Sequence, residues 1–279
     1  MSRRSRKKRR SGGWIVLLVV IVLAVMLFDS NYRIVTDEYE VTFDDLPEEF
    51  DGYRIVQISD LHARQFGEGN RRLMEAVLRA DPDIIVVTGD LIDGPDQGAV
   101  IRETMSAIAP IAPTYYVTGN HEWDSGGLSE LWQILDDCGV ITLRNEYVML
   151  ERRGAQLALA GAEDPGGPYD METPEELIAA IRAREGNDVF LAVLNHRNDR
   201  LDRYAALDVD LVLSGHAHGG LIRLPFTDGL YGPGRDFLPT YTSGVCTSGD
   251  TVMVVSRGFA GPVRFLNNPE LAVTVLRAG

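Results

Sequence analysis

The sequence predicts an α/β fold of stacked sheets covered by helices, with one apolar helix before it. Short apolar runs typical of buried strands alternate with helical patterns along most of the chain. The segment from residue 240 to residue 276 is strand-rich, and glycines mark the turns between its strands. No low-complexity stretch or internal repeat interrupts residues 35–279. A single α/β domain after the N-terminal helix is therefore expected.

The individual elements follow from the local pattern. The runs expected as strands are residues 54–58, 84–88, 114–117, 157–160, 190–194 and 211–213. Helical patterns occupy residues 70–80, 100–109 and 174–184. Thr173 is the expected N-cap of the last helix, and Glu176 is the partner that completes a capping box.

Composition and charge exclude several classes of protein. Of the 279 residues, 45% are hydrophobic and 24% charged, and there are 28 Gly, 13 Pro and only 2 Cys. These values exclude a disordered tail protein, a collagen-like repeat and a small disulfide-stapled domain. The net charge is −14, and because residues 1–13 hold seven basic and no acidic side chains, the remainder has 20 basic against 41 acidic ones. An acidic domain repels polyanions, so no nucleic-acid partner is expected.

The N-terminal segment predicts a membrane anchor. After the basic tail of residues 1–13, fifteen apolar residues run without interruption over 14–28. A cleaved signal peptide and an uncleaved signal anchor both fit this run, but its Met-Leu-Phe-Asp ending at 26–29 lacks the small residues of a cleavage site, which favours the anchor. The basic tail then stays in the cytoplasm, and residues 30–279 lie outside. Ser2-Arg3-Arg4 matches a twin-arginine export signal only weakly.

The two cysteines leave one alternative open. Cys138 and Cys246 could pair in an oxidising compartment, but two separate buried thiols are the commoner arrangement.

Small polar clusters directly follow five of the predicted strands. The clusters are Ser59-Asp60-Leu61-His62, Gly89-Asp90-Leu91-Ile92-Asp93, Gly119-Asn120-His121-Glu122, Asn195-His196 and Ser214-Gly215-His216-Ala217-His218. All five histidines of the protein fall within them. Because ligands bind at the carboxyl ends of strands in open α/β sheets, these clusters are expected to converge on one crevice.

The residue types in this crevice predict metal ions. Imidazole and carboxylate without thiolate suit Zn, Mn, Fe or Ni, and the sequence does not choose among them. In Asp60-x-His62 and His216-x-His218 the two side chains share one side of an extended segment. One ion with an open position needs fewer ligands than the sequence offers, so two metals bridged by a carboxylate are expected. The candidate ligands are Asp60, His62, Asp90, Asn120, His196, His216 and His218.

These motifs, taken in order, resemble those of the calcineurin-like metallophosphoesterases. The match consists of D-x-H at 60–62, G-D-x-x-D at 89–93, G-N-H-E at 119–122, the lone His196 and G-H-x-H at 215–218. Segments 219–225, 229–231 and 255–258 are similar to the bacterial subgroup with an N-terminal transmembrane segment, and the similarity runs from about residue 33 to 276. The resemblance implies a four-layer αββα sandwich of two mixed sheets flanked by helices.

The resemblance also implies a role for each residue. One metal would take Asp60, His62 and His218, the other would take Asn120, His196 and His216, and Asp90 would bridge them. His121 would act at the leaving-group oxygen as a general acid or transition-state stabiliser. Asp93 and Glu122 would orient histidines.

Some positions depart from the subgroup's pattern. Ala217 stands where Thr is usual, Leu221 where Gln is usual, and Asn195-His196-Arg197-Asn198 replaces Ser-His-x-Pro. None of the departing positions is an expected ligand, so they bear on pocket shape and substrate choice. Arg64 could meet a phosphate, but a solvated surface arginine is the favoured interpretation.

The function implied is a membrane-anchored, monomeric, dinuclear-metal phosphoesterase that hydrolyses phosphomonoesters or phosphodiesters by a metal-activated hydroxide. Its substrate could be lipid-linked or derived from the cell envelope. One alternative is a pyrophosphate hydrolase of the UDP-2,3-diacylglucosamine type, acting on a glycolipid precursor. An alternative of another class is a non-catalytic, metal-containing module that binds the envelope. The basic tail of 1–13, the anchor of 14–28 and the catalytic domain of 29–279 are the expected units.

Overall fold

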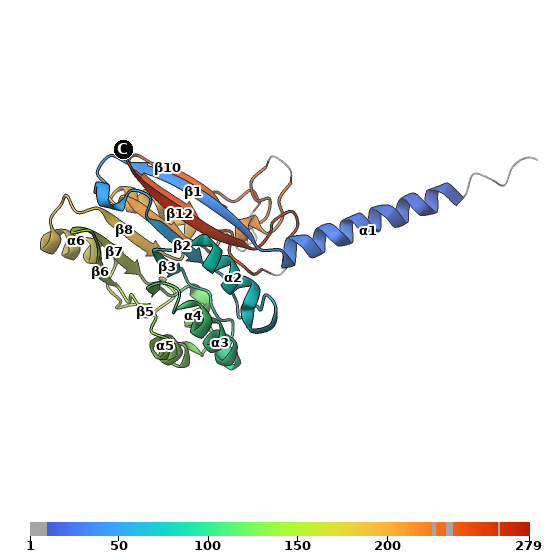
Figure 1. Cartoon of the computed structure of the whole chain (residues 1–279), viewed down its shortest axis with the longest axis horizontal. Helices are drawn as coiled ribbons and strands as arrows, with labels where there is room; N and C mark the ends of the chain where they lie inside the picture. Colours follow the sequence, from blue (N-terminus) through green and yellow to red (C-terminus); the bar gives the residue numbers. More distant parts are fainter. Residues whose placement is uncertain (1–9, 225–226, 233–236, 262) are drawn as a thin grey trace, which may run out of the picture.

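The structure is a computed structural model and describes residues 10–224, 227–232, 237–261 and 263–279. A long helix, α1 (Arg10–Tyr32), projects from one end of a compact body (Figure 1). Its segment Gly13–Tyr32 is long and apolar enough to cross a membrane, and almost none of it is buried against the body. The Ser2-Arg3-Arg4 motif lies outside the described residues.

Two six-stranded mixed sheets form the centre of the body. The first has the order β1 (Val35–Phe43), β12 (Glu270–Ala278), β2 (Arg54–Ile58), β3 (Ile84–Val87), β4 (Thr114–Tyr116) and β5 (Ile141–Thr142). The second has the order β10 (Gly244–Ser248), β11 (Thr251–Val255), β9 (Leu211–Ser214), β8 (Leu191–Asn195), β7 (Ala155–Ala162) and β6 (Glu146–Arg152). β2, β3 and β4 are mutually parallel, as are β7, β8 and β9.

Helices cover the outer faces of both sheets. The first sheet is covered by α2 (Arg71–Ala80), α3 (Gly98–Ile108) and α5 (Leu128–Asp137), and the second by α6 (Pro174–Glu185) and α7 (Leu201–Ala205). The short α4 (Asn120–Asp124) follows β4. Single 3-10 turns are η1 (Glu48–Phe50), η2 (Glu68–Asn70), η3 (Pro95–Gln97), η4 (Asn198–Arg200) and η5 (His218–Gly220).

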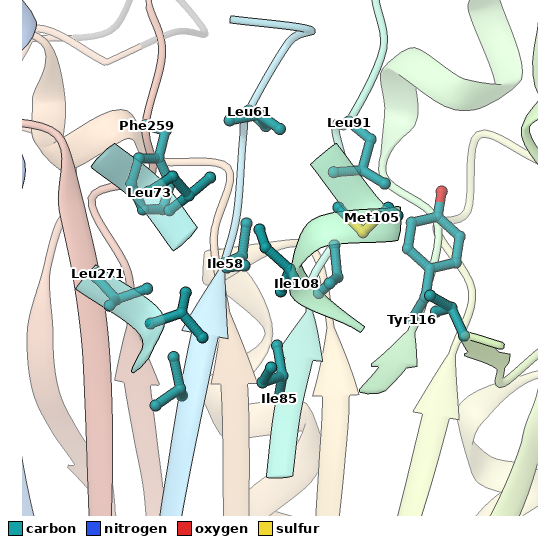
Figure 2. Close-up of a cluster of buried hydrophobic side chains, with 14 of the residues drawn as sticks. Ile58, Leu61, Leu73, Ile85, Leu91, Met105, Ile108, Tyr116, Phe259 and Leu271 are labelled. Carbon is teal, nitrogen blue, oxygen red and sulfur yellow. The ribbon is translucent and has the colours of Figure 1, made fainter. Parts of the chain in front are cut away.

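Three apolar clusters hold these layers together. Between the sheets, residues such as Ile55 and Val86 of the first meet Leu194 and Leu213 of the second. A second cluster joins α2, α3 and α5 to the first sheet, and Figure 2 shows part of it around Ile85. A third joins α6 and α7 to the second sheet. The layer order is therefore helix, sheet, sheet, helix, which confirms the expected αββα sandwich.

Most expected elements are present. All six predicted strands and all three predicted helices occur, with ends that differ by a few residues. Thr173 caps α6 and exchanges hydrogen bonds with Glu176, as a capping box requires. Among the elements not predicted, β1 is amphipathic and pairs with the distant β12, so its partner is set by the fold rather than by neighbouring sequence. Cys138 and Cys246 are free thiols.

Replacing Leu73 by alanine tests the packing of α2. Leu73 is completely buried in the cluster of Figure 2, whereas Leu78 of the same helix is 52% exposed. We expect Leu73→Ala to lower the free energy of unfolding by about 2–5 kcal/mol, because it removes buried methyl groups and leaves a cavity. Leu78→Ala should change it by less than about 0.5 kcal/mol. Denaturant unfolding of the full chain in detergent measures both, and equal effects would contradict this placement of α2.

Candidate active site

The polar clusters converge where the carboxyl ends of five strands meet. Their residues follow β2, β3 and β4 in the first sheet and β8 and β9 in the second. Two sets of hydrogen bonds join the two sheets at this edge. The His216 backbone N–H donates to both carboxylate oxygens of Asp60, at 3.2 and 3.1 Å, and Gln57 Nε2 donates to the Ser214 carbonyl at 2.8 Å. The site therefore forms only when both sheets are in place.

The Asp90 carboxylate lies at the centre of the site. Its Oδ2 is 3.2 Å from His196 Nε2, 3.8 Å from His62 Nε2 and 4.0 Å from His121 Nε2. Its Oδ1 accepts a hydrogen bond from the His121 backbone N–H. Burial alone would raise the pKa of Asp90, but the surrounding histidines, His196 foremost, hold it well below its usual value. Asp90 is thus placed to face two ligand groups at once.

Hydrogen bonds from one ring nitrogen fix the orientation of three histidines. His62 Nδ1 lies 2.5 Å from Asp93 Oδ1, His196 Nδ1 lies 2.7 Å from the Thr88 carbonyl, and His218 Nδ1 lies 2.9 Å from the Ala260 carbonyl. Because an acceptor oxygen faces each Nδ1, that nitrogen donates a hydrogen bond, and the Nε2 atom of each ring can bind a cation once it has lost its proton.

The inward-facing atoms form two groups that fit cations. Asp60, His62, Asp90 and His218 offer ligand atoms that all lie within 4.8 Å of one another, and so do Asp90, His196 and His216. His196 Nε2 and His216 Nδ1 are only 3.1 Å apart. Within the described residues, His62 Nε2 and Asn120 Oδ1 are buried without a hydrogen-bond partner. Buried polar atoms without partners are costly, so the donor set fits two cations that share Asp90.

His121 stands at the open side of the site. Its side chain is 43% exposed, and its Nδ1 lies 2.9 Å from Asp93 Oδ1. The same Asp93 oxygen contacts His62, and the two imidazole rings meet edge to face at 4.8 Å. The hydrogen bond to Asp93 raises the pKa of His121. In turn, hydrogen bonds from His121 and His62 lower the pKa of Asp93. Asp93 therefore contacts two histidines of the site through one carboxylate oxygen.

Glu122 has a different part from the one expected. Its buried carboxylate accepts hydrogen bonds from the backbone N–H groups of Asp90 (2.9 Å), Leu91 (2.5 Å) and Gly119 (2.6 Å), not from a histidine ring. The expectation that Glu122 orients histidines is thus wrong. Glu122 instead ties the loop after β3 to the start of α4, because it satisfies N–H groups that no strand or helix pairs.

The backbone of the site is locally strained. Asp60, His62, Asp90, His216 and His218 all have positive φ, between 48° and 65°. For non-glycine residues this left-handed conformation costs about 1–2 kcal/mol each. Gly89 and Gly119 relieve crowding beside Asp90, since a Cβ on Gly89 would collide with the Gly119 backbone and a Cβ on Gly119 with the Asp90 carboxylate. Such strain is typical of functional sites, where the surrounding fold stabilises it.

Two arginines have contacts that the sequence did not reveal. Arg197 forms a bidentate ion pair with the buried Asp164, at 2.6 and 3.0 Å, and its Nη1 lies 3.4 Å from His216 Nε2. In the sequence, the contacts of Arg197 are indicated only by the departure of this loop from the Ser-His-x-Pro pattern. Arg64, expected as a solvated surface arginine, is half-buried and donates a 2.5 Å hydrogen bond to the Asn31 carbonyl at the end of α1. That expectation is wrong because α1 packs over Arg64.

Comparisons with known proteins agree with this geometry. Residues 53–220 match the family described as calcineurin-like phosphoesterase. A Bacillus subtilis protein described as uncharacterized metallophosphoesterase YkuE is 32% identical over 261 residues, covering 88% of this chain and 87% of that protein. A Danio rerio transmembrane protein with metallophosphoesterase domain is 27% identical over 245 residues, covering 79% of this chain and 54% of that protein. The solved structure of TT1561 from Thermus thermophilus superposes with a TM-score of 0.50 at 14% identity, covering 74% of this chain and 90% of that one.

Glutamine in place of Glu122 tests the bracing of the two loops. The amide would turn an NH2 group toward backbone N–H donors, so we expect Glu122→Gln to lower affinity for divalent cations about 10- to 100-fold, as seen when groups that support metal ligands are lost. The control is Asp124→Asn, an exposed carboxylate of the same short helix. Titration with Mn²⁺ by calorimetry measures both variants. Wild-type affinity in Glu122→Gln would contradict the bracing role.

Proposed function

Because the chain belongs to the calcineurin-like phosphoesterase family, we propose that this site hydrolyses phosphate esters with two divalent cations that share Asp90. The observation that carries the proposal is the position of Asp90 Oδ2, which faces the Nε2 atoms of His196 and His62 from within both ligand groups. Members of this family use a dinuclear divalent metal centre. The substrate is a phosphomonoester or a phosphodiester.

The proposed ligands divide into two sets around Asp90. Asp60, His62 and His218 would hold one cation, and Asn120, His196 and His216 the other. This division is supported by the burial of Asp60 and His196 and by Asn120 Oδ1, which has no hydrogen-bond partner among the described residues. When bound, two such cations would neutralise phosphate oxygens and acidify the attacking water. Mn, Fe, Zn and Ni all suit this donor set.

The remaining residues have proposed roles in orientation and proton transfer. His121 would donate a proton to the leaving alcohol oxygen, since its ring is exposed at the open side and its Nε2 faces inward toward Asp90. Asp93 would keep that ring in place through Nδ1. An acidic protein surface repels an anionic substrate, and a cationic centre at the carboxyl ends of the strands offsets this repulsion locally.

Alanine in place of His121 separates catalysis from metal binding. We expect the wild-type chain to hold two metal ions and to hydrolyse bis-p-nitrophenyl phosphate or p-nitrophenyl phosphate in a chelator-sensitive way. His121→Ala should lower kcat about 10²- to 10⁴-fold, the usual contribution of a general acid, while both ions remain. Metal content by mass spectrometry and initial rates measure this, with Asp124→Ala as the control. Full turnover in His121→Ala would refute its role, and a wild-type chain without metal or turnover would refute the site.

We also propose that α1 anchors the protein with the catalytic body outside the cytoplasmic membrane. The length and apolar composition of Gly13–Tyr32 support an anchor, and the basic residues before it support a cytoplasmic N-terminus. At about 1.5 Å per residue this segment spans about 30 Å, close to the thickness of the hydrocarbon core. The Danio rerio relative is also described as a transmembrane protein.

Protease treatment of intact spheroplasts checks the orientation. If the body is outside, we expect added protease to degrade it without lysis, because only the N-terminal tail is shielded by the membrane. A cytoplasmic marker protein, which must stay intact, is the control for leakage. Degradation of the body only after lysis would reverse the proposed orientation.

A further inference from the structure

The last turns of α1 lie beside the catalytic residues rather than away from them. We propose that these turns form one wall of the substrate cleft, and that the substrate is a phosphate ester of an amphiphile embedded in the same membrane as α1. This inference rests on the phosphoesterase function proposed above. It assigns α1 a part in binding substrate in addition to anchoring the protein.

A single cleft connects α1 with the candidate active site. Its volume is about 1120 Å³. One side is lined by His62, Asp93, His121 and His218, and the other by Leu27, Phe28, Asn31 and Tyr32 of α1. Leu27, Phe28 and Tyr32 present large exposed apolar surfaces. The cleft therefore has a polar, ligand-bearing side and an apolar side, as an amphiphilic substrate requires.

Hydrogen bonds fix the end of α1 against the body. Ser30 is buried, and its Oγ accepts from the Leu266 backbone N–H at 2.8 Å. Asn31 Nδ2 donates to the Arg264 carbonyl at 2.9 Å, and its Oδ1 accepts from the Arg264 backbone N–H at 3.3 Å. Because these polar side chains pair with a defined segment of the body, the apolar wall has a fixed position relative to the histidines.

Arg64 lies in the cleft between the two sides. Its guanidinium binds the Asn31 carbonyl and lies 5.1 Å from the centre of the Tyr32 ring and 5.4 Å from that of Phe66. It forms no ion pair within the described part of the chain. A guanidinium with unused donors is suited to a phosphate oxygen, so Arg64 can position an anionic headgroup on its way to the cation site.

Exposed apolar side chains surround the same end of the body. Phe237, Leu238 and Val263 are 82%, 71% and 57% exposed. Phe237 packs on Tyr231, which lines the cleft, and Val263 directly precedes the Arg264 that binds α1. Figure 1 shows the loops of this region beside the base of α1. Exposed apolar groups next to a membrane-spanning helix are suited to the interface of the bilayer.

The expected position of α1 in the membrane favours a lipid-like substrate. If Gly13–Tyr32 spans the bilayer, Leu27 to Tyr32 lie near its surface, at the depth of lipid headgroups. A lipid phosphate can enter the cleft there while its alkyl chain stays against α1. In the reaction, the oxygen of a water molecule bonds to phosphorus, the bond from phosphorus to the alcohol oxygen breaks, and one proton released by the water goes to that alcohol oxygen. The alkyl-bearing product remains in the membrane whether the alkyl group stays on the phosphate or leaves as the alcohol.

A pair of reporters tests the apolar wall. The full chain in phosphatidylcholine vesicles is given hexadecyl p-nitrophenyl phosphate, which partitions into the bilayer, or the water-soluble bis-p-nitrophenyl phosphate. We expect the wild type to have at least tenfold higher kcat/KM for the hexadecyl reporter. In Leu27→Ser the ratio of the two kcat/KM values should fall about tenfold, the loss expected when roughly two methylene groups lose apolar contact.

The matched control is Leu18→Ser, which makes the same change on the same helix. Leu18 is nine residues earlier, about two and a half turns, and so lies on the opposite face of α1. We expect Leu18→Ser to keep the wild-type ratio of the two kcat/KM values. A wild-type ratio in Leu27→Ser, or a wild type without preference for the hexadecyl reporter, would overturn the inference and indicate a water-soluble substrate. If neither reporter is hydrolysed, nor p-nitrophenyl phosphate as a phosphomonoester, the proposed function itself fails.

Photocrosslinking gives a readout that needs neither turnover nor metal. The photoreactive p-benzoylphenylalanine replaces Leu27 or Leu18, and the vesicles contain a few mole percent of deuterated hexadecyl phosphate. We expect adducts from position 27 to be enriched in hexadecyl phosphate above its mole fraction, and adducts from position 18 to follow the mole fraction. Equal composition at the two positions would overturn the inference, even where Leu27→Ser fails to fold.

Discussion

The structure depends on keeping the Asp90 carboxylate buried among histidine rings. A buried charge is costly unless opposite charges or hydrogen bonds surround it, and Asp90 has both, from His196 at 3.2 Å and from the His121 backbone N–H. These partners come from different sheets, because His196 follows β8 whereas His121 follows β4. The two sheets must therefore present their carboxyl ends at one edge. The apolar cluster between them maintains that alignment, so core packing and site geometry depend on each other.

The same requirement explains the unusual backbone around the site. Side chains that converge from five short loops cannot all do so from extended or helical backbone, and five of these residues have positive φ. The strain persists because adjacent elements fix the backbone on both sides: β2, β3 and β4 are anchored in a sheet, and Glu122 accepts hydrogen bonds from N–H groups of the loops after β3 and β4. Rigid strands hold the strained loops, and the strained loops hold the ligand atoms close together.

The sequence predicted what is encoded locally and missed what depends on distant contacts. Strands β2, β3, β4, β8 and β9 were evident because each apolar run ends in a polar cluster, and Asp60 to His62 and His216 to His218 do lie in one site. Glu122 was misassigned because its partners are backbone N–H groups, which carry no sequence signal. Arg64 was misjudged because its burial comes from α1, a helix expected to act only as an anchor. The pairing of β1 with β12 joins the two ends of the domain, which no local pattern specifies.

The buried Arg264 connects the end of α1 to a candidate metal ligand. Its backbone N–H donates to Asn31 of α1, while its guanidinium donates to the Ala260 carbonyl at 2.8 Å, and the same carbonyl lies 2.9 Å from His218 Nδ1. Burial lowers the pKa of Arg264 to about 9, because a desolvated guanidinium is less favourable in its charged form. A shift of α1 would move the segment that holds His218. Ser30 and Asn31 therefore belong to the helix and to the body at once.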